Sequence, residues 1–298
     1  MRPWFRYLVY ASLVFLAVAL YKADYLVIPR VHSPTALICS LVFLLFGFIG
    51  DGLSWRKILD KSGHPISVSE TIAATGLSSF AKYIPGKIWA VMGRAGYIAE
   101  KRPYSLGGLT SVSVTWQLLM LWLGLIFGAF GLILLDQILV WGWPILLLWL
   151  GLTTLIFSDV AQSLAQRLYK KIFSKDITIP RLSAGSTLTA LPWFVITWIS
   201  FSIGFYLLAA GLSPDVVPRS VGLGFPLSIA LGVMAVLIPG GLGVREGFMV
   251  GYLKLAGFSL QDATTISVAA RLWFLAGEIF IFVLGMMASA RVDKTRSV

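Results

Sequence analysis

The sequence has 298 residues, of which 58% are hydrophobic and only 12% are charged, and its formal net charge is +11. With a mean hydropathy of +0.86, the chain has more apolar surface than a soluble globule can bury, which excludes a soluble enzyme and indicates an all-α polytopic membrane protein. The positive charge does not predict nucleic-acid binding, because the basic residues lie between apolar segments, where the positive-inside rule accounts for them.

The apolar segments follow one another along the chain with short polar connections. We mark eight of them, at about residues 4–20, 34–50, 71–99, 105–135, 141–157, 187–210, 220–256 and 262–290. The first has basic flanks at Arg2 and Arg6 and no small-residue cleavage site, so we interpret it as a transmembrane helix and not as a signal peptide. Cys39 is the single cysteine, which excludes a disulfide framework.

The segment 71–99 is broken in its middle by Pro85 and Gly86. Each half would be about 20 Å long as a helix, which is too short for a hydrocarbon core of about 30 Å. If the segment enters and leaves on the cytoplasmic side, the basic residues around it stay inside, and so does the basic loop 158–186. We therefore predict a re-entrant helical hairpin.

The segment 220–256 is broken in the same way at Pro239. A hairpin that enters from outside keeps the basic C-terminal tail in the cytoplasm, whereas a full span would place it outside. The first arm, 220–238, is almost long enough to span the membrane, although Pro226 interrupts it. A second re-entrant hairpin is the prediction here.

The two breaks share a motif, because Ile84-Pro85-Gly86 recurs as Ile238-Pro239-Gly240. The predicted path has about six transmembrane helices and two hairpins, and its halves run in opposite directions through the membrane. We therefore expect one transmembrane domain over residues 1–298, built as an inverted-topology repeat of about 1–137 and 138–290. A short tail, 291–298, and the N-terminus are both expected to be cytoplasmic.

A half-helix that starts at mid-depth offers unpaired amides and the positive end of its dipole to an anion. Such starts are expected near Lys87 and near Val244. Arg271 is placed in the last helix, close to the midplane of the membrane. A charge at that depth is costly, which makes Arg271 a functional candidate. The residues predicted to bind an anionic headgroup are Lys87, Gly240, Gly241, Gly243, Arg245 and Arg271.

A second set of charged residues is predicted to support this site. Glu246 and Glu278 would compensate the arginines or carry protons, with Glu246 orienting Arg245. Lys82 and Arg94 are added as supporting cations, although snorkelling to the cytoplasmic interface would also explain them. The alternative for the whole set is a group of structural ion pairs that lock the second hairpin to the last helix.

No catalytic residue, metal site or cofactor is predicted. His32 and His64 are isolated, and the aspartates are scattered without metal-ligand spacing. Asp51 is interpreted as a structural residue near the cytoplasmic end of a span. For Gln117 we favour a hydrogen bond between helices over a position in a polar cavity.

The run from Lys82 to Arg94 and the run Ile238-Pro239-Gly240-Gly241-Leu242-Gly243-Val244-Arg245-Glu246-Gly247 resemble a known signature. It belongs to the flippase-like transmembrane region of lysylphosphatidylglycerol synthases, the multiple peptide resistance factor family. The resemblance covers most of the chain and implies movement of a lipid or lipid-linked headgroup between leaflets. Full synthases carry a soluble aminoacyl-transferase domain after this region, and no such domain follows in this sequence, so lysyl transfer from tRNA is not expected.

The leading hypothesis is a lipid flippase or transporter of a bacterial or archaeal plasma membrane, which moves a phospholipid or a polyprenyl-phosphate-linked glycolipid headgroup and is not an enzyme. Its expected partners are membrane lipids. One alternative is a membrane-embedded glycosyl- or headgroup transferase. Another is a non-transporting partner that recruits a lipid- or glycan-synthesising enzyme through the basic loop 158–186.

Overall fold

The computed structural model describes residues 30–84, 88–163, 167, 184–234 and 243–296, and within these ranges it contains helices and no β-strand. Five of the helices are long and apolar enough to span a membrane, and they are α2 (Pro34–Lys61), α5 (Leu106–Leu134), α6 (Ile138–Phe157), α8 (Ala184–Leu212) and α11 (Leu260–Arg296). The predicted all-α polytopic membrane protein is confirmed. The span predicted at residues 4–20 lies outside the described residues.

Helix α2 continues beyond the apolar segment marked at 34–50, as far as Lys61. The second half of the helix carries charged residues, yet the side chains of Trp55, Ile58 and Leu59 are fully buried. Arg56 does not stop the helix, since its Nε donates a hydrogen bond to the carbonyl of Ile66 at 2.8 Å. A buried apolar stripe thus runs on through this more polar half of the helix.

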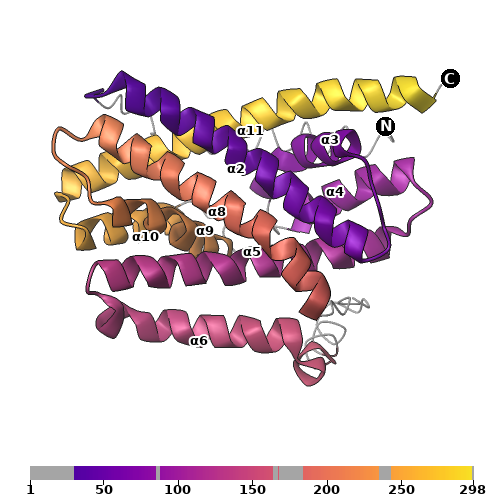
Figure 1. The fold of residues 1–298 in the computed structure, drawn as a ribbon, viewed down its shortest axis with the longest axis horizontal. Helices are drawn as coiled ribbons and strands as arrows, with labels where there is room; N and C mark the ends of the chain where they lie inside the picture. The colour runs from indigo at the N-terminus through magenta and orange to yellow at the C-terminus, as the bar shows by residue number, and fades with distance from the viewer. Residues whose placement is uncertain (1–29, 85–87, 164–166, 168–183, 235–242, 297–298) are drawn as a thin grey trace.

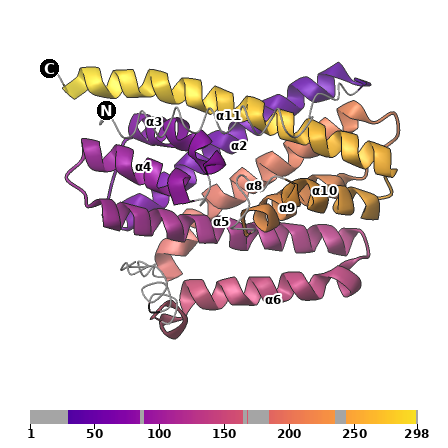
Figure 2. The same ribbon diagram turned by 180° about the vertical axis from the view of Figure 1, so that it is seen from behind.

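Two pairs of short helices lie at opposite ends of the long ones (Figures 1 and 2). The first pair consists of α3 (Val68–Ser78), which continues as the 3₁₀ turn η1 (Ser79–Tyr83), and α4 (Ile88–Lys101). The second consists of the 3₁₀ turn η2 (Arg219–Leu223), α9 (Gly224–Met234) and α10 (Val244–Leu255).

The members of each pair are in contact with each other, α3 with α4 and α9 with α10. The first pair lies where α2 ends and α5 begins, and the second lies where α8 ends and α11 begins (Figure 1). Pro85, Gly86 and Pro239, the predicted breaks, lie outside the described residues. Entry into a membrane from opposite sides stays a prediction.

The short helices are packed reciprocally against the long ones. In the first half of the chain α3 lies along α11, and in the second half α9 lies along α5. The first contact is so close that a Cβ added to Gly76 would meet the backbone of Ile281 and would come within 2.8 Å of the Cα of Gly285. Glycine is therefore required at this crossing. The inverted repeat itself stays a prediction.

Helices α2 and α8 run side by side through the middle of the molecule (Figure 1). A cluster of aromatic rings is buried where they meet α9 and α11. Phe48 of α2 packs against Phe201 of α8 and against Phe274 of α11, with ring centroids 5.6 and 4.9 Å apart. Phe225 of α9 joins the same cluster, 5.9 Å from Phe201. Helix α6 lies outside this centre and packs against α5, where Trp122 stacks on Trp149.

Candidate functional site

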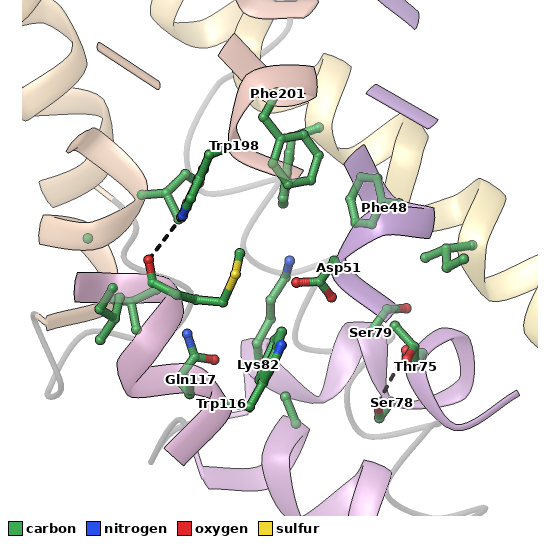
Figure 3. Close-up of a pocket in the computed structure, with 18 of the residues that line it drawn as sticks. Phe48, Asp51, Thr75, Ser78, Ser79, Lys82, Trp116, Gln117, Trp198 and Phe201 are labelled. Carbon is green, nitrogen blue, oxygen red and sulfur yellow. Dashed lines mark hydrogen bonds between the residues drawn. The ribbon is translucent and has the colours of Figure 1, made fainter. Parts of the chain in front are cut away.

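A cavity of about 190 Å³ lies at the centre of the helices, between the two pairs of short helices. Its wall includes residues of α2, α3, η1, α4, α5, α8, α9, α10 and α11. Figure 3 shows Asp51, Lys82 and Gln117 turned toward this space, beside the rings of Trp116, Trp198 and Phe201. The charged residues in the wall are Asp51, Lys82, Arg94, Arg245 and Arg271.

Arg94 of α4 reaches into this cavity and pairs with Asp51 of α2. The Arg94 Nη2 donates a hydrogen bond to Asp51 Oδ2 at 3.1 Å, and both side chains are more than four-fifths buried. The guanidinium also lies over the ring of Trp116 at 4.2 Å and over that of Trp55 at 5.7 Å. Both indoles are held in place, because their N–H groups donate to serines on the facing helix.

Glu278 of α11 is completely buried and joins the last helix to the first pair of short helices. Its Oε1 accepts a hydrogen bond from Lys82 Nζ, and its Oε2 accepts one from the Tyr83 hydroxyl at 2.8 Å. The Lys82 ammonium lies 4.8 Å from the centroid of the Phe274 ring, within range of a cation–π contact. Lys82 is thus paired with a carboxylate at the cavity.

Glu246 of α10 has two functions in the structure, and neither is the predicted orientation of Arg245. One oxygen, Oε2, accepts the backbone N–H of Gly243 at 2.7 Å and so caps α10. The other, Oε1, lies 3.7 Å from Nη1 of Arg271. Gly243 has a φ of +80°, a left-handed conformation that favours glycine at the start of this helix. Glu246 therefore pairs with Arg271, because the start of α10 turns the Glu246 side chain toward α11.

Arg245 is the cation of the cavity with no carboxylate of its own. Its guanidinium lies over the rings of Phe225 and Phe274, 4.9 and 4.8 Å from their centroids, and these two rings are neighbours with centroids 5.6 Å apart. The residue is only 6% exposed, and its Nη2 is buried with no hydrogen-bond partner in the described part of the chain. Gly232 of α9 makes room for it, since a Cβ there would come within 2.9 Å of the Arg245 Cβ.

The structure brings together the predicted residues that it describes. Lys82, Arg94, Arg245 and Arg271 line one cavity, and Glu246 and Glu278 pair with two of these cations. Gly243 is the residue that precedes α10, which begins at Val244 as expected. Lys87, Gly240 and Gly241 lie outside the described residues.

Sequence reasoning missed three features of the site. Asp51 lies in the cavity wall instead of capping a span, and a charged residue within a long apolar run was the available signal. Gln117 also lines the cavity. Tyr83 and the rings of Phe225 and Phe274 gave no signal, because aromatic residues in apolar segments are usually core. Within the described ranges, no group of three or more His, Cys, Asp or Glu side chains could hold a metal ion.

Comparisons with known proteins give one match. A family model described as the lysylphosphatidylglycerol synthase TM region matches residues 4–285. No curated protein and no solved structure has a significant match. The matched residues include both pairs of short helices and the whole wall of the cavity.

Proposed function

Because the chain belongs to the family of lysylphosphatidylglycerol synthase transmembrane regions, we propose that it is a lipid flippase. It moves the headgroup of a phospholipid or of a polyprenyl-phosphate-linked glycolipid between the leaflets of a bacterial or archaeal plasma membrane. Both termini are cytoplasmic, membrane lipids are its partners, and it acts as a transporter and not as an enzyme. The observation that carries the proposal is the buried guanidinium of Arg245 in a central cavity, whose Nη2 has no hydrogen-bond partner in the described part of the chain.

An unpaired charge in a low-dielectric interior costs several kcal/mol. A purely structural arginine would therefore be expected beside a carboxylate, as Arg94 is beside Asp51. An arginine that binds an anionic ligand does not require a neighbouring carboxylate, since the ligand completes its hydrogen bonds. Arg245 matches the second case because it lines the cavity and lacks an ion pair in the described part of the chain.

The surroundings of the cavity suit a lipid whose acyl chains stay in the bilayer while its headgroup enters the polar cavity. The long helices expose apolar side chains around the site, among them Phe46 of α2 and Phe130 of α5, so acyl chains can remain in the bilayer. The headgroup enters the polar cavity, where Arg245 binds its phosphate and Arg271, Lys82 and Arg94 supply further positive potential. Rearrangement of the short helix pairs then opens the cavity to the other leaflet.

The test is leaflet exchange of fluorescent phospholipids and of a fluorescent polyprenyl-phosphate sugar in liposomes that contain the purified protein. We expect exchange faster than in empty liposomes, and a fall of at least about tenfold for Arg245→Ala, since a charged hydrogen bond contributes about 1.5–3 kcal/mol. Lys254→Ala is the matched control, because Lys254 is exposed on the same helix. It should exchange lipid at the wild-type rate.

Equal exchange by the protein and by empty liposomes for every lipid offered would reject the flippase. Chemical conversion of a nucleotide-sugar or prenyl-sugar donor by the same preparation would instead support the transferase alternative. Loss of function after neutralisation of the basic loop 158–186, with Arg245→Ala fully active, would support the recruiting partner.

A further inference from the structure

A groove of about 410 Å³ lies apart from the central cavity, between α5, α8 and η2. No described residue lines both spaces. Ile199 and Ile203 in the wall of the groove are exposed, so the groove opens to the surroundings of the bundle, which in a membrane are lipid tails. The aliphatic and phenyl side chains that line it are those of Phe127, Ile199, Ile203, Leu207 and Leu223.

The groove is not a branch of the central cavity. Gly124 of α5 lies between Met120, which lines the cavity, and Phe127, which lines the groove. A Cβ added to Gly124 would meet the ring of Trp198 at 3.1 Å and the Cβ of Ala230 at 3.2 Å. Helices α5, α8 and α9 are therefore packed against one another at this level, and a molecule in the groove is separated from the cavity.

One end of the groove carries a positive charge. Among the described residues that line the groove, Arg219 alone is charged, and it is exposed at the start of η2. Asp215, in the preceding loop, forms no ion pair with Arg219 in the described part of the chain. An arginine whose stem lies on apolar surface and whose charge stays at the interface is suited to a lipid phosphate.

A buried hydroxyl group lies one turn from this cation. Ser202 of α8 lines the groove and is 7% exposed, and its Oγ has no hydrogen-bond partner in the described part of the chain. Thr197 of the same helix shows the usual solution, because its hydroxyl donates to the carbonyl of Trp193. Ser202 lies level with Gly222, whose added Cβ would come within 2.5 Å of the Ser202 carbonyl oxygen. Gly222 follows Arg219 by three residues, about 6 Å at the rise of a 3₁₀ turn.

We propose that this groove binds one glycerophospholipid with a negatively charged headgroup, as a bound partner of the protein and not as its transported lipid. The phosphate lies at Arg219, an ester oxygen of the glycerol accepts the Ser202 hydroxyl, and one acyl chain lies beside Phe127 and Ile199. The three parts of the lipid follow one another in the same order as their partners along the groove. A zwitterionic headgroup fits less well, because its own ammonium group competes with Arg219 for the phosphate.

The bound lipid connects elements that the second pair of short helices depends on. It contacts η2, which has five residues and leads directly into α9, and it contacts α5 and α8 at the same time. Helical segments of this length are marginal without tertiary contacts. The lipid therefore stabilises the start of this pair against the long helices.

The experiment compares two lipids with the same acyl chains. Native mass spectrometry of the purified full chain in detergent measures binding of dioleoyl phosphatidylglycerol, which is negatively charged, and of dioleoyl phosphatidylcholine, which has no net charge. We expect phosphatidylglycerol to bind at least about fivefold more tightly, and Arg219→Gln to remove that difference. Lys254→Gln removes an exposed cation of α10 outside the groove and should leave the difference unchanged.

Two outcomes of this comparison would overturn the proposal. One is equal affinity for the two lipids in the wild type. The other is a preference that survives Arg219→Gln and disappears in Arg245→Ala, since the lipid would then be bound in the central cavity.

A second variant fills the groove. Ile203→Trp places a larger side chain in its wall and should lower the affinity for phosphatidylglycerol at least about fivefold. Leu188→Trp is the matched control, because Leu188 is exposed on the same helix and lies outside the groove. Phosphatidylglycerol should raise the unfolding temperature of the wild type and of Leu188→Trp, but not that of Ile203→Trp. Wild-type affinity together with wild-type stabilisation in Ile203→Trp would reject the groove as the site.

Leaflet exchange in liposomes separates this site from transport. Ile203→Trp should retain exchange, because the packed helices at Gly124 keep the groove apart from the cavity. Loss of exchange in a folded Ile203→Trp protein would make the groove part of the transport path and would overturn the assignment to a bound partner lipid. Absence of exchange in the wild type, with the preference for phosphatidylglycerol intact, would reject the flippase and would support the lipid site alone.

Discussion

At the scale of single residues, each carboxylate near the cavity connects two different elements. Asp51 links α2 to α4, Glu246 links α10 to α11, and Glu278 links α11 to η1. Such pairs add little net stability when they form, but losing one partner leaves an uncompensated buried charge. Their main contribution is to fix which helices lie together around the cavity.

Glu70 makes a similar link outside the spans, at the start of α3. It accepts hydrogen bonds from Arg102 Nε at 2.8 Å and Arg102 Nη2 at 3.0 Å, and from the backbone N–H of Ser67 at 2.9 Å. Burial raises the pKa of the Glu70 carboxyl, but the hydrogen bonds from Arg102 and Ser67 lower it by more, so the pKa lies below its ordinary value.

This lowered pKa predicts a pH dependence of stability. A depressed folded-state pKa means that the stabilisation is present above the unfolded pKa of about 4.3 and is lost as the pH falls through the folded pKa. Glu70→Gln should therefore lower the unfolding temperature at pH 7 and should lose part of the acid-induced decrease below about pH 4. Thermal unfolding in detergent measures both, and identical curves for variant and wild type would contradict the role of Glu70.

At the scale of elements, the fold depends on how the short helices are held, because helices of this length are marginal alone. Helix α3 has 11 residues, and a capping box between Ser67 and Glu70 satisfies its first amides. Its packing on α11 supplies the rest, through the close approach of Gly76 to Gly285.

Two glycine substitutions should have opposite effects. Gly76→Ala places a methyl group against the backbone of α11, which cannot move aside, and should destabilise the protein by about 1–3 kcal/mol. Gly251→Ala lies in α10 with nothing within 4 Å of the new methyl group, and should stabilise by about 0.5–1 kcal/mol through helix propensity. Unfolding by denaturant in mixed micelles compares them, and a loss of stability for Gly251→Ala equal to that of Gly76→Ala would rule out this explanation.

The sequence predicted the helices better than it predicted which charged side chains pair with each other. The start of α10 at Val244 followed from the glycine run before it, and the five long helices followed from their apolar length. The continuation of α2 to Lys61, beyond the apolar segment 34–50, depends on the burial of Trp55 and Leu59, which the sequence does not show. The pairing of Glu246 with Arg271 agrees with the alternative of ion pairs between the second hairpin and the last helix. The sequence could not choose between Arg245 and Arg271 as the partner, since a side chain three residues into a helix can face several neighbours.

At the scale of the whole molecule, each pair of short helices begins and ends at the same end of the bundle (Figure 1). If the pairs are re-entrant, exposed positions on either side of α3 and α4 face the cytoplasm, and those on either side of α9 and α10 face outside.

Cysteine accessibility tests this arrangement in a Cys39→Ala background. Lys61→Cys and Gly107→Cys should react with a membrane-impermeant maleimide only in inside-out vesicles, and Asp215→Cys and Gln261→Cys only in right-side-out ones. All four positions are exposed. Opposite labelling of Lys61→Cys and Gly107→Cys would mean that the chain between them crosses the membrane once, and the same holds for the second pair.

The crossing of Gly76 and Gly285 also determines which parts of the protein can move as rigid bodies. Sliding one half of the sequence past the other would drag α3 across α11 at a point where two backbones touch without side chains between them. Any motion that keeps this contact carries α3 with α11, although they come from different halves. The same applies to α9 and α5, where Leu227 fills the space beside Gly128. The rigid units of the molecule therefore each combine helices from both halves of the sequence. Motion between these units bends the connections that lead into and out of the short helices.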